Sequence, residues 1–433
     1  MNQKDNYLLY TLCRCESTEG KIDNFQHFHK IRMKKLAAIL VTILIDFISF
    51  GIISPIIGPL LKSSFLVLDA SYSDTSRNYV IGILTATFSI FQLFSGPILG
   101  SLSDRIGRKK VLNITVGLTF ISYLVFAFGI LYGNLSLLLL SRAVGGIAAG
   151  NLAVIFSSVS DISTPENKTA HFGMIGACFG IGFVLGPMIG SVLSNNEIVE
   201  WFNYTTPFFF TSILTLLNWF LIKWFYTETN SNINPNAEVK WNQGLLNFKS
   251  AWKNENLKYY FFMVFLFVVG FTVFTQYFQV KLIDSFHYDT PKIGYYYSFI
   301  GICIIIIQGV IVRNLYGMMQ EKQVVLMALM LAAIGFTLLS TAETTLWIYL
   351  FSIIVAMGQG IFSPFISGLI STEASKENQG ETFGIQSAVQ AGAQICGPLL
   401  GAQLVNININ FSLWAGAILS FISAMVFYKK KWN

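Results

Sequence analysis

Two ionisable side chains stand deep inside apolar segments of the sequence, where a charge is costly and usually has a function. Asp46 lies about ten residues into the segment 36–61, roughly 15 Å from one end of a helix. Arg142 lies about eight residues into the segment 134–157, roughly 12 Å from the opposite surface. In a hydrocarbon core roughly 30 Å thick these depths nearly coincide, so the two charges can neutralise each other. If Asp46 takes a proton, Arg142 is released to hold another group, and we predict a functional role for this exchange of partners.

The alternative for Asp46 and Arg142 is a static ion pair that fixes the packing of two helices. A buried pair with only a structural role could be replaced by apolar packing at little or no cost in stability. We therefore favour the functional role. The second half of the sequence has no equally deep Asp, Glu, Lys or Arg, which makes the site one-sided.

No other group of residues indicates catalysis or metal binding. The sequence has no phosphate-cradling glycine loop, no nucleophile triad and no C-x-x-C pair of cysteines. Cys13 and Cys15 lie near the N-terminus, whereas Cys178, Cys303 and Cys396 lie in apolar segments and are expected to be packing residues. We predict no catalytic residue, no metal site and no cofactor, with a proton gradient as the energy source. The chain is not expected to be an enzyme.

The composition is that of a protein whose solvent is lipid. Of the 433 residues 54% are hydrophobic and only 12% are charged, and the mean hydropathy is +0.59. A soluble domain carries roughly 25% charged residues. A run of about 20 apolar residues spans a bilayer as a helix, since backbone groups in lipid must pair internally. The predicted spans are 36–61, 78–99, 110–132, 134–157, 171–194, 204–226, 259–282, 293–314, 323–341, 344–370, 383–406 and 408–428.

The basic residues between these twelve spans predict the orientation. With the N-terminus inside, the inner segments from Lys30 onward hold 20 Lys and Arg residues and the outer loops hold 4. Positive residues concentrate on the cytoplasmic side, so both termini are expected to be cytoplasmic. The net charge of +6 then reflects this bias and not a nucleic-acid partner.

A polar stretch halfway along the chain divides the spans into six and six. It contains Trp241 and Trp252, which suggest an amphipathic piece at the membrane surface. The predicted parts are a cytoplasmic N-terminal tail without fixed structure (1–35), a first six-helix bundle (36–226), a cytoplasmic linker (227–258), a second six-helix bundle (259–428) and a cytoplasmic tail (429–433).

The two halves repeat each other at an offset of 211 residues. Phe172-Gly173 recurs as Phe383-Gly384, Gly186-Pro187 as Gly397-Pro398, and Gly190 as Gly401. Self-similarity at half the chain length is typical of transporters built from paired bundles. The sequence therefore predicts pseudo-symmetry between the bundles.

One short charged loop joins the second and third spans. Its basic residues alone would serve as an anchor on the inner side, but such an anchor needs neither an acid nor fixed glycines. The corresponding region of the second half, near Arg313 and Gly317, lacks the acid. We predict a latch on one bundle only, at the cytoplasmic face. Its residues are Gly100, Asp104, Arg105, Gly107, Arg108 and Lys109.

Small residues and amides mark two further spans. Gly182, Gly186, Pro187 and Gly190 allow close helix approach and a kink in the fifth span, and we predict a seam that packs tightly and bends. In the eleventh span three glutamines repeat every four residues on one face. They either hydrogen-bond other helices or line an aqueous substrate path. The three are Gln386, Gln390 and Gln394.

These motifs together resemble those of the major facilitator superfamily, within it the twelve-span drug/proton antiporters, and are similar to tetracycline efflux proteins. The loop Gly100-x-x-x-Asp104-Arg105-x-Gly107-Arg108-Lys109 fits the superfamily signature between spans two and three. The stretch Gly182-x-x-x-Gly186-Pro187-x-x-Gly190 is similar to the antiporter signature in the fifth span. The resemblance covers about 36–428.

The resemblance implies an all-α integral membrane protein with twelve transmembrane helices in two pseudo-symmetric six-helix bundles around a central cavity. It implies alternating access and proton-driven export, in which Asp46 takes the proton and Arg142 couples that event to the cavity. It also implies that Asp104 and Arg108 hold the bundles together in the outward-open state, with Asp104 facing the start of the eleventh helix.

We therefore expect a secondary active transporter, a proton-coupled exporter of drug-like molecules, in a bacterial inner membrane. Its expected partners are a small-molecule substrate, protons and lipid, without nucleic acid, and it is expected to be a monomer. The ninth span lacks the acid that tetracycline exporters carry there, which leaves the substrate open. The alternatives are a metabolite or siderophore carrier of the same fold, importing or exporting, and a receptor that does not transport.

Overall fold

The structure, a computed structural model, describes residues 35–62, 66–164, 168–230, 233–235, 239, 241–253, 257–373 and 379–429. The predicted tail before residue 35, which includes Cys13 and Cys15, lies outside the described residues, as does nearly all of the C-terminal tail. The described part of the chain is helical and has no strand.

The helices follow one another closely, with short turns. They run in the order 35–53, α2 (Ile57–Lys62), α3 (Asp74–Ile106), α4 (Arg108–Leu131), α5 (Leu135–Ala149), α6 (Asn151–Ile162), α7 (Lys168–Leu193), α8 (Thr206–Phe225), α9 (Gln243–Lys253), α10 (Lys258–Phe286), α11 (Thr290–Ile306), the π-helical η1 (Ile307–Val312), α12 (Arg313–Leu315), α13 (Glu321–Ser340), α14 (Thr345–Glu373), α15 (Gln379–Ile407) and α16 (Phe411–Lys429).

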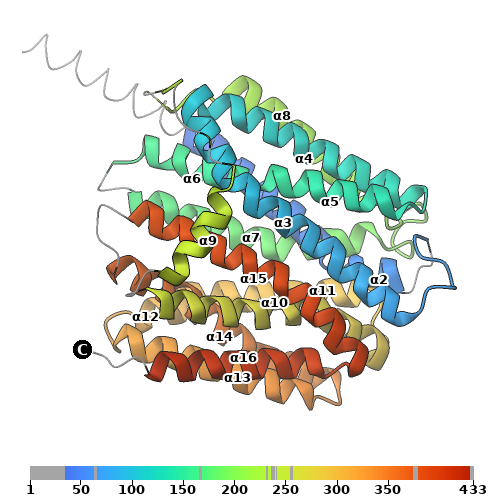
Figure 1. Ribbon diagram of the computed structural model, residues 1–433. Coiled ribbons are helices and arrows are strands. Elements are labelled where there is room, and N and C mark those ends of the chain that lie inside the picture. The colour runs from blue at the N-terminus through green and yellow to red at the C-terminus, as the bar shows by residue number, and fades with distance from the viewer. Residues whose placement is uncertain are drawn as a thin grey trace, which may run out of the picture.

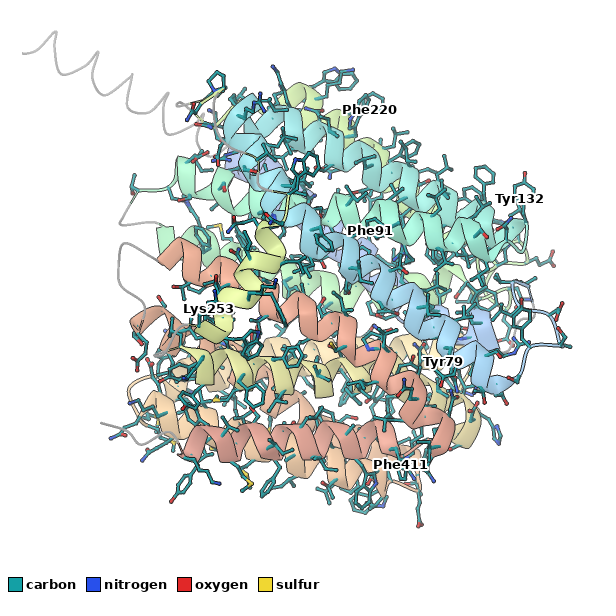
Figure 2. The ribbon with its side chains drawn as sticks, viewed as in Figure 1. Tyr79, Phe91, Tyr132, Phe220, Lys253 and Phe411 are labelled. Atoms are coloured by element: carbon teal, nitrogen blue, oxygen red, sulfur yellow. The ribbon has the colours of Figure 1, made fainter. Side chains whose placement is uncertain are left out.

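The membrane-length helices confirm the predicted fold class. Within the described residues, eleven helices are long and apolar enough to cross a membrane. The twelfth predicted span corresponds to α15, which is 29 residues long but less apolar, so its crossing stays a prediction. Figure 2 shows apolar side chains such as Tyr132 and Phe411 pointing outward from the bundles, as expected where lipid is the solvent.

The helices form two bundles, as Figure 1 shows: the blue-to-green helices lie in one half of the view and the yellow-to-red helices in the other. The most extensive contacts between the bundles are those of α3 with α15 and of α7 with α11. Within each bundle the pseudo-symmetric glycines make matching contacts. A Cβ on Gly190 would lie 2.5 Å from the carbonyl oxygen of Ile52, and a Cβ on Gly401 would lie 2.5 Å from the ring of Tyr277.

At the end of the molecule that carries α2, polar contacts tie the two bundles together. Lys62 forms an ion pair with Asp284 at 2.6 Å. The Nδ2 of Asn78 donates to Oδ1 of Asn406 at 2.8 Å, and the Tyr277 hydroxyl donates to the carbonyl oxygen of Asn78 at 3.0 Å. The bundles are therefore closed against each other at this end.

Near the opposite end, helix α9 of the predicted linker lies across both bundles (Figure 1). A Cβ on Gly244 would lie 2.3 Å from the carbonyl oxygen of Leu93 in α3, and a Cβ on Gly392 of α15 would lie 2.6 Å from the ring of Phe248. Trp252 makes edge contacts with rings on α10. The helix thus packs between α3 and α15, which is a closer association than the interfacial position predicted for it.

Lys281 is one of the four basic residues counted above with the outer loops, and that placement is wrong. This residue belongs to α10 and is only 4% exposed. Its Nζ donates to the carbonyl oxygens of Leu339 and Ser340, at 3.3 and 3.1 Å, and to Oδ1 of Asn410 at 2.8 Å. A cation at the C-terminal end of a helix satisfies carbonyl groups that have no partner in the helix, which allows Lys281 to be buried at the end of α13.

Candidate functional site

Asp46 is held by an amide from α6. The Nδ2 of Asn151 donates to Oδ2 of Asp46 at 2.8 Å. The other carboxylate oxygen, Oδ1, is buried and has no hydrogen-bond partner among the described residues. Asn151 reaches this position because the fourth span is interrupted at Gly150, which packs against Ser95 and Gly96 of α3 so closely that a Cβ would collide with them. The site therefore presents one oxygen that can accept a proton.

Arg142, on α5, lies among aromatic rings. Its guanidinium carbon is 4.8 Å from the centre of the Phe126 ring and 5.5 Å from that of Phe88. It also hydrogen-bonds the hydroxyl of Tyr123, while its Nε has no partner. The residue is 4% exposed, and cation–π contacts with two rings stabilise the charge there.

The structure corrects the predicted direct ion pair between Asp46 and Arg142. In the part of the chain that the structure describes, the carboxylate is bound by Asn151 and the guanidinium by Tyr123 and the two rings. Tyr123 interacts electrostatically with both charges. The two residues share one region, as predicted, but a neutral partner holds each of them.

The charged loop between α3 and α4 turns at Gly107, whose φ of 98° suits glycine. Arg108 pairs with Asp104 at 2.6 Å and with Asp161 of α6 at 3.2 Å, and it hydrogen-bonds Ser103. The other loop residues are less constrained: Arg105 is exposed, Lys109 is partly exposed, and a Cβ on Gly100 would meet only Ala153 at 3.7 Å.

A residue that the sequence analysis missed completes this loop. Both carboxylate oxygens of Glu228, just after α8, accept hydrogen bonds at 3.0 Å from the backbone N–H groups of Arg108 and Lys109. An acid is favourable at the N-terminus of a helix such as α4. A Cβ on Gly107 would lie 2.5 Å from Oε2 of Glu228, so the glycine also makes room for this contact.

The cross-bundle latch stays a prediction. Asp104 pairs with Arg108 of its own loop, and the side chains at the start of α15, residues 379–381, lie outside the described residues. Its side chain is 51% exposed and is therefore available for another partner in a different conformation.

We predict that Glu228→Ala lowers the free energy of unfolding by about 1–2 kcal/mol, because two N–H groups at the start of α4 lose their acceptor. Unfolding by SDS in mixed micelles measures the change. Glu200→Ala, at an exposed position at the other end of the molecule, is the control and is expected to be neutral. Equal stability of both variants would contradict the assigned cap.

The predicted seam packs against the first helix, within one bundle. A Cβ on Gly186 would lie 2.6 Å from the carbonyl oxygen of Ile48, and one on Gly182 would lie 2.5 Å from Cβ of Phe47. The opposite side of α7 faces the second bundle, where the carbonyl oxygen of Pro187 lies 2.8 Å from a Cβ built on Gly294 of α11. The seam joins the helix of Asp46 to the bundle interface.

The three glutamines of α15 have different surroundings. Gln386 is 5% exposed, and its Nε2 donates to the hydroxyl of Ser367 on α14 at 3.1 Å. This contact is the helix-to-helix role weighed above, although Oε1 of Gln386 has no partner. Gln390 and Gln394 are partly exposed, and their predicted place on a substrate path stays a prediction.

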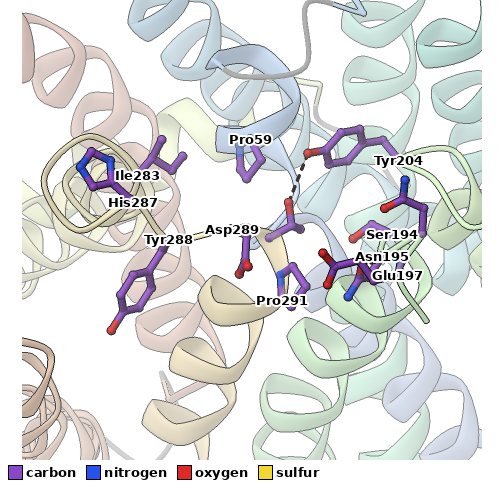
Figure 3. A pocket seen from close by; sticks show the side chains of 12 residues that line it. Pro59, Ser194, Asn195, Glu197, Tyr204, Ile283, His287, Tyr288, Asp289 and Pro291 are labelled. Carbon is purple, nitrogen blue, oxygen red and sulfur yellow. Dashed lines mark hydrogen bonds between the residues drawn. The ribbon is translucent and has the colours of Figure 1, made fainter.

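A cavity of about 480 Å³ lies at the α2 end, away from Asp46 (Figure 3). It is lined by the residues that follow α7 and by the turn between α10 and α11, with a hydrogen bond of 3.3 Å between the hydroxyls of Tyr204 and Thr290. No predicted site residue lines it. Among the described residues, no group of three or more His, Cys, Asp or Glu side chains could hold a metal ion.

Comparison with known proteins gives concordant matches. The family model of the Major Facilitator Superfamily matches residues 39–395. The chain is 27% identical over 400 residues to the tetracycline resistance protein, class H, of Pasteurella multocida, covering 89% of this chain and 92% of that protein. It is 25% identical over 394 residues to the quinolone resistance protein NorA of Staphylococcus aureus, covering 91% and 95%.

Solved structures share the fold. The crystal structure of the human organic anion transporter MFSD10 has a TM-score of 0.71 at 20% identity and covers 92% of this chain and 99% of that one. A D-xylose–proton symporter has a TM-score of 0.73 at 16% identity, covering 91% and 98%. These likenesses confirm the arrangement of the helices.

Proposed function

Because the chain belongs to the major facilitator superfamily, we propose that it is a proton-coupled exporter of drug-like organic molecules that works by alternating access. The observation that carries the proposal is the site of Asp46. Among the described residues, the carboxylate of Asp46 inside a membrane span has one oxygen without a partner, and the buried guanidinium of Arg142 lies in the same region without an acid. Charges left unpaired inside a membrane protein are costly, which supports a functional role.

The contacts between the bundles support alternating access. We infer that the α2 end faces outward, since the Lys and Arg bias places α9 and the termini inside. The conformation described is then closed to the outside by contacts such as Lys62 with Asp284. Rocking of one bundle against the other would open these contacts and close the inner side.

Aromatic side chains near Asp46 support flat organic substrates. Phe50 lies one turn after Asp46 and is 45% exposed, and its ring centre is 5.8 Å from that of Phe88. The relatives named above confer resistance to tetracycline or to quinolones. We propose export of such compounds across a bacterial inner membrane by a monomer with both termini in the cytoplasm. No observation favours a metabolite carrier or a receptor.

The test uses the purified protein in liposomes with an acidic lumen in neutral buffer. Tetracycline, a quinolone and ethidium serve as separate probes. We expect at least one probe to accumulate in the lumen as protons leave, and a protonophore to prevent this. Protein-free liposomes given the same gradient are the control. If no probe responds to the gradient, or if probe and protons move in the same direction, the proposed exchange is wrong.

A further inference from the structure

Two neutral residues hold the charged groups of the proposed proton site. Asn151 is 4% exposed and Tyr123 is 7% exposed, so neither is a surface residue. They lie on different helices, α6 and α4. Asn151 donates to one oxygen of Asp46, and Tyr123 hydrogen-bonds Arg142.

We propose that Asn151 and Tyr123 are positioning residues that keep Asp46 and Arg142 apart until Asp46 takes a proton. This inference rests on the proposed proton coupling and adds the residues that set the affinity of the site for the proton. Neither residue touches the proton or the substrate. Each acts by holding one charged group in place.

Such residues are needed because a direct ion pair between Asp46 and Arg142 would hinder protonation. A direct pair between a carboxylate and a guanidinium in a low-dielectric interior stabilises both charged forms and opposes protonation of the acid. A hydrogen bond from the Asn151 amide stabilises the carboxylate less than a full positive charge would. The proton can then bind a lone pair of Oδ1, the oxygen without a partner, and no ion pair has to break.

Tyr123 supplies the other half of the arrangement. Its hydroxyl accepts from Arg142, and the ring of Phe126 lies 4.8 Å from the same guanidinium. Tyr123 also lies near Asp46. Without the hydroxyl, the donor groups of Arg142 would need another acceptor, and the carboxylate of Asp46, which also lies near Tyr123, can serve as one.

The remaining helices packed around Asp46 contribute no further charge. From α7, Cys178 donates its thiol hydrogen to the carbonyl oxygen of Leu40, and Phe179 stacks edge-on against Phe47. From α8, Asn218 accepts from the hydroxyl of Thr42, one turn before Asp46. Among the described residues, the side chains that interact with Asp46 are therefore Asn151 and Tyr123.

The experiment measures proton binding at Asp46 directly, without transport. Infrared difference spectra of the purified protein are recorded against pH, and the carboxylic acid band that disappears in Asp46→Asn is assigned to Asp46. We expect Asn151→Ala to move the midpoint of this band to higher pH by about one unit, a tenfold change in proton affinity, since the charged form loses a donor. We expect Tyr123→Phe to move it to lower pH by a similar amount, since Arg142 becomes free to pair with Asp46.

Opposite shifts are the result that a merely structural role would not produce. Asn218→Ala removes a buried amide that bonds Thr42, one turn from Asp46, and Tyr297→Phe removes a buried hydroxyl of the second bundle. Neither side chain contacts Asp46 or Arg142 among the described residues, so both variants are expected to leave the midpoint unchanged. If Asn151→Ala does not fold, Asn151→Leu replaces it, because leucine has the same number of side-chain heavy atoms and the same branching as asparagine and has no donor. Midpoints that stay fixed, or that move in the same direction in both variants, overturn the inference.

The same spectra separate this inference from the proposed function. If the midpoints shift in opposite directions but no probe follows the gradient in liposomes, the positioning roles stand and the proposed export falls. If export is driven by the gradient while neither midpoint moves, the export stands and the positioning roles fall.

Discussion

Asp46→Asn is expected to abolish transport driven by a pH gradient and to leave exchange of substrate across the membrane intact. Asparagine keeps the shape of the side chain and can still bond Asn151, but it cannot take up a proton. The gradient then has no group on which to act, whereas the bundles can still rock with substrate bound. Liposomes loaded with unlabelled substrate measure the exchange, and the same liposomes with an acidic lumen measure the driven uptake.

Glu200→Gln is the matched control for Asp46→Asn, because it also neutralises a carboxylate, at an exposed position at the α2 end. We expect it to behave as the unaltered protein in both assays. If Asp46→Asn still accumulates substrate against its gradient, the proton binds elsewhere, and Asp46 and Arg142 would have the static role weighed from the sequence.

The positions of the membrane helices could be predicted because hydropathy reports a physical requirement that each span meets alone. A helix in lipid must be apolar for about 20 residues whatever its neighbours do. Helix α15 does not reach the hydropathy expected of a membrane span. It packs between α3 and α10 and carries the polar residues Gln386, Gln390 and Gln394. The sequence analysis predicted this span as one of twelve runs of about 20 mostly apolar residues.

The partners within the site could not be predicted, because they depend on how helices rotate against one another. Depth along the helix placed Asp46 and Arg142 in one region, but depth does not show which side of each helix faces its neighbours. The break at Gly150 turns α6 so that Asn151 meets the carboxylate. A signal was available: polar residues inside apolar spans usually hydrogen-bond another helix, and Asn151 is such a residue.

The contacts made by the linker could not be predicted from the sequence, for a different reason. Glu228 stands in a polar stretch with no spacing pattern, and only the folded loop shows that it caps α4. Likewise, α9 reads as an interfacial helix, yet Gly244 and Phe248 pack it between α3 and α15. A close approach at a small residue can be predicted only when the surfaces of both packed helices are known.

Cross-linking residues 78 and 406 is expected to stop transport completely and reversibly. Asn78 on α3 and Asn406 on α15 hydrogen-bond at 2.8 Å across the closed α2 end, and alternating access requires that they separate in every cycle. The five native cysteines are first replaced by serine, and Asn78→Cys and Asn406→Cys are introduced together. A short disulfide-containing cross-linker joins the two thiols, and the accumulation of a transported probe in liposomes is measured.

Cleavage of the cross-link and a control cross-link within one bundle show whether transport stops because the bundles cannot separate. Reductant cleaves the cross-linker and is expected to restore accumulation, which damage to the fold would not allow. A second pair, Ser73→Cys and Ser76→Cys, has hydroxyls 3.0 Å apart at the start of α3 and joins residues of one bundle only. This control is expected to transport at full rate when cross-linked. Full transport with 78 and 406 joined would show instead that the α2 end stays closed throughout the cycle, and alternating access as proposed would be wrong.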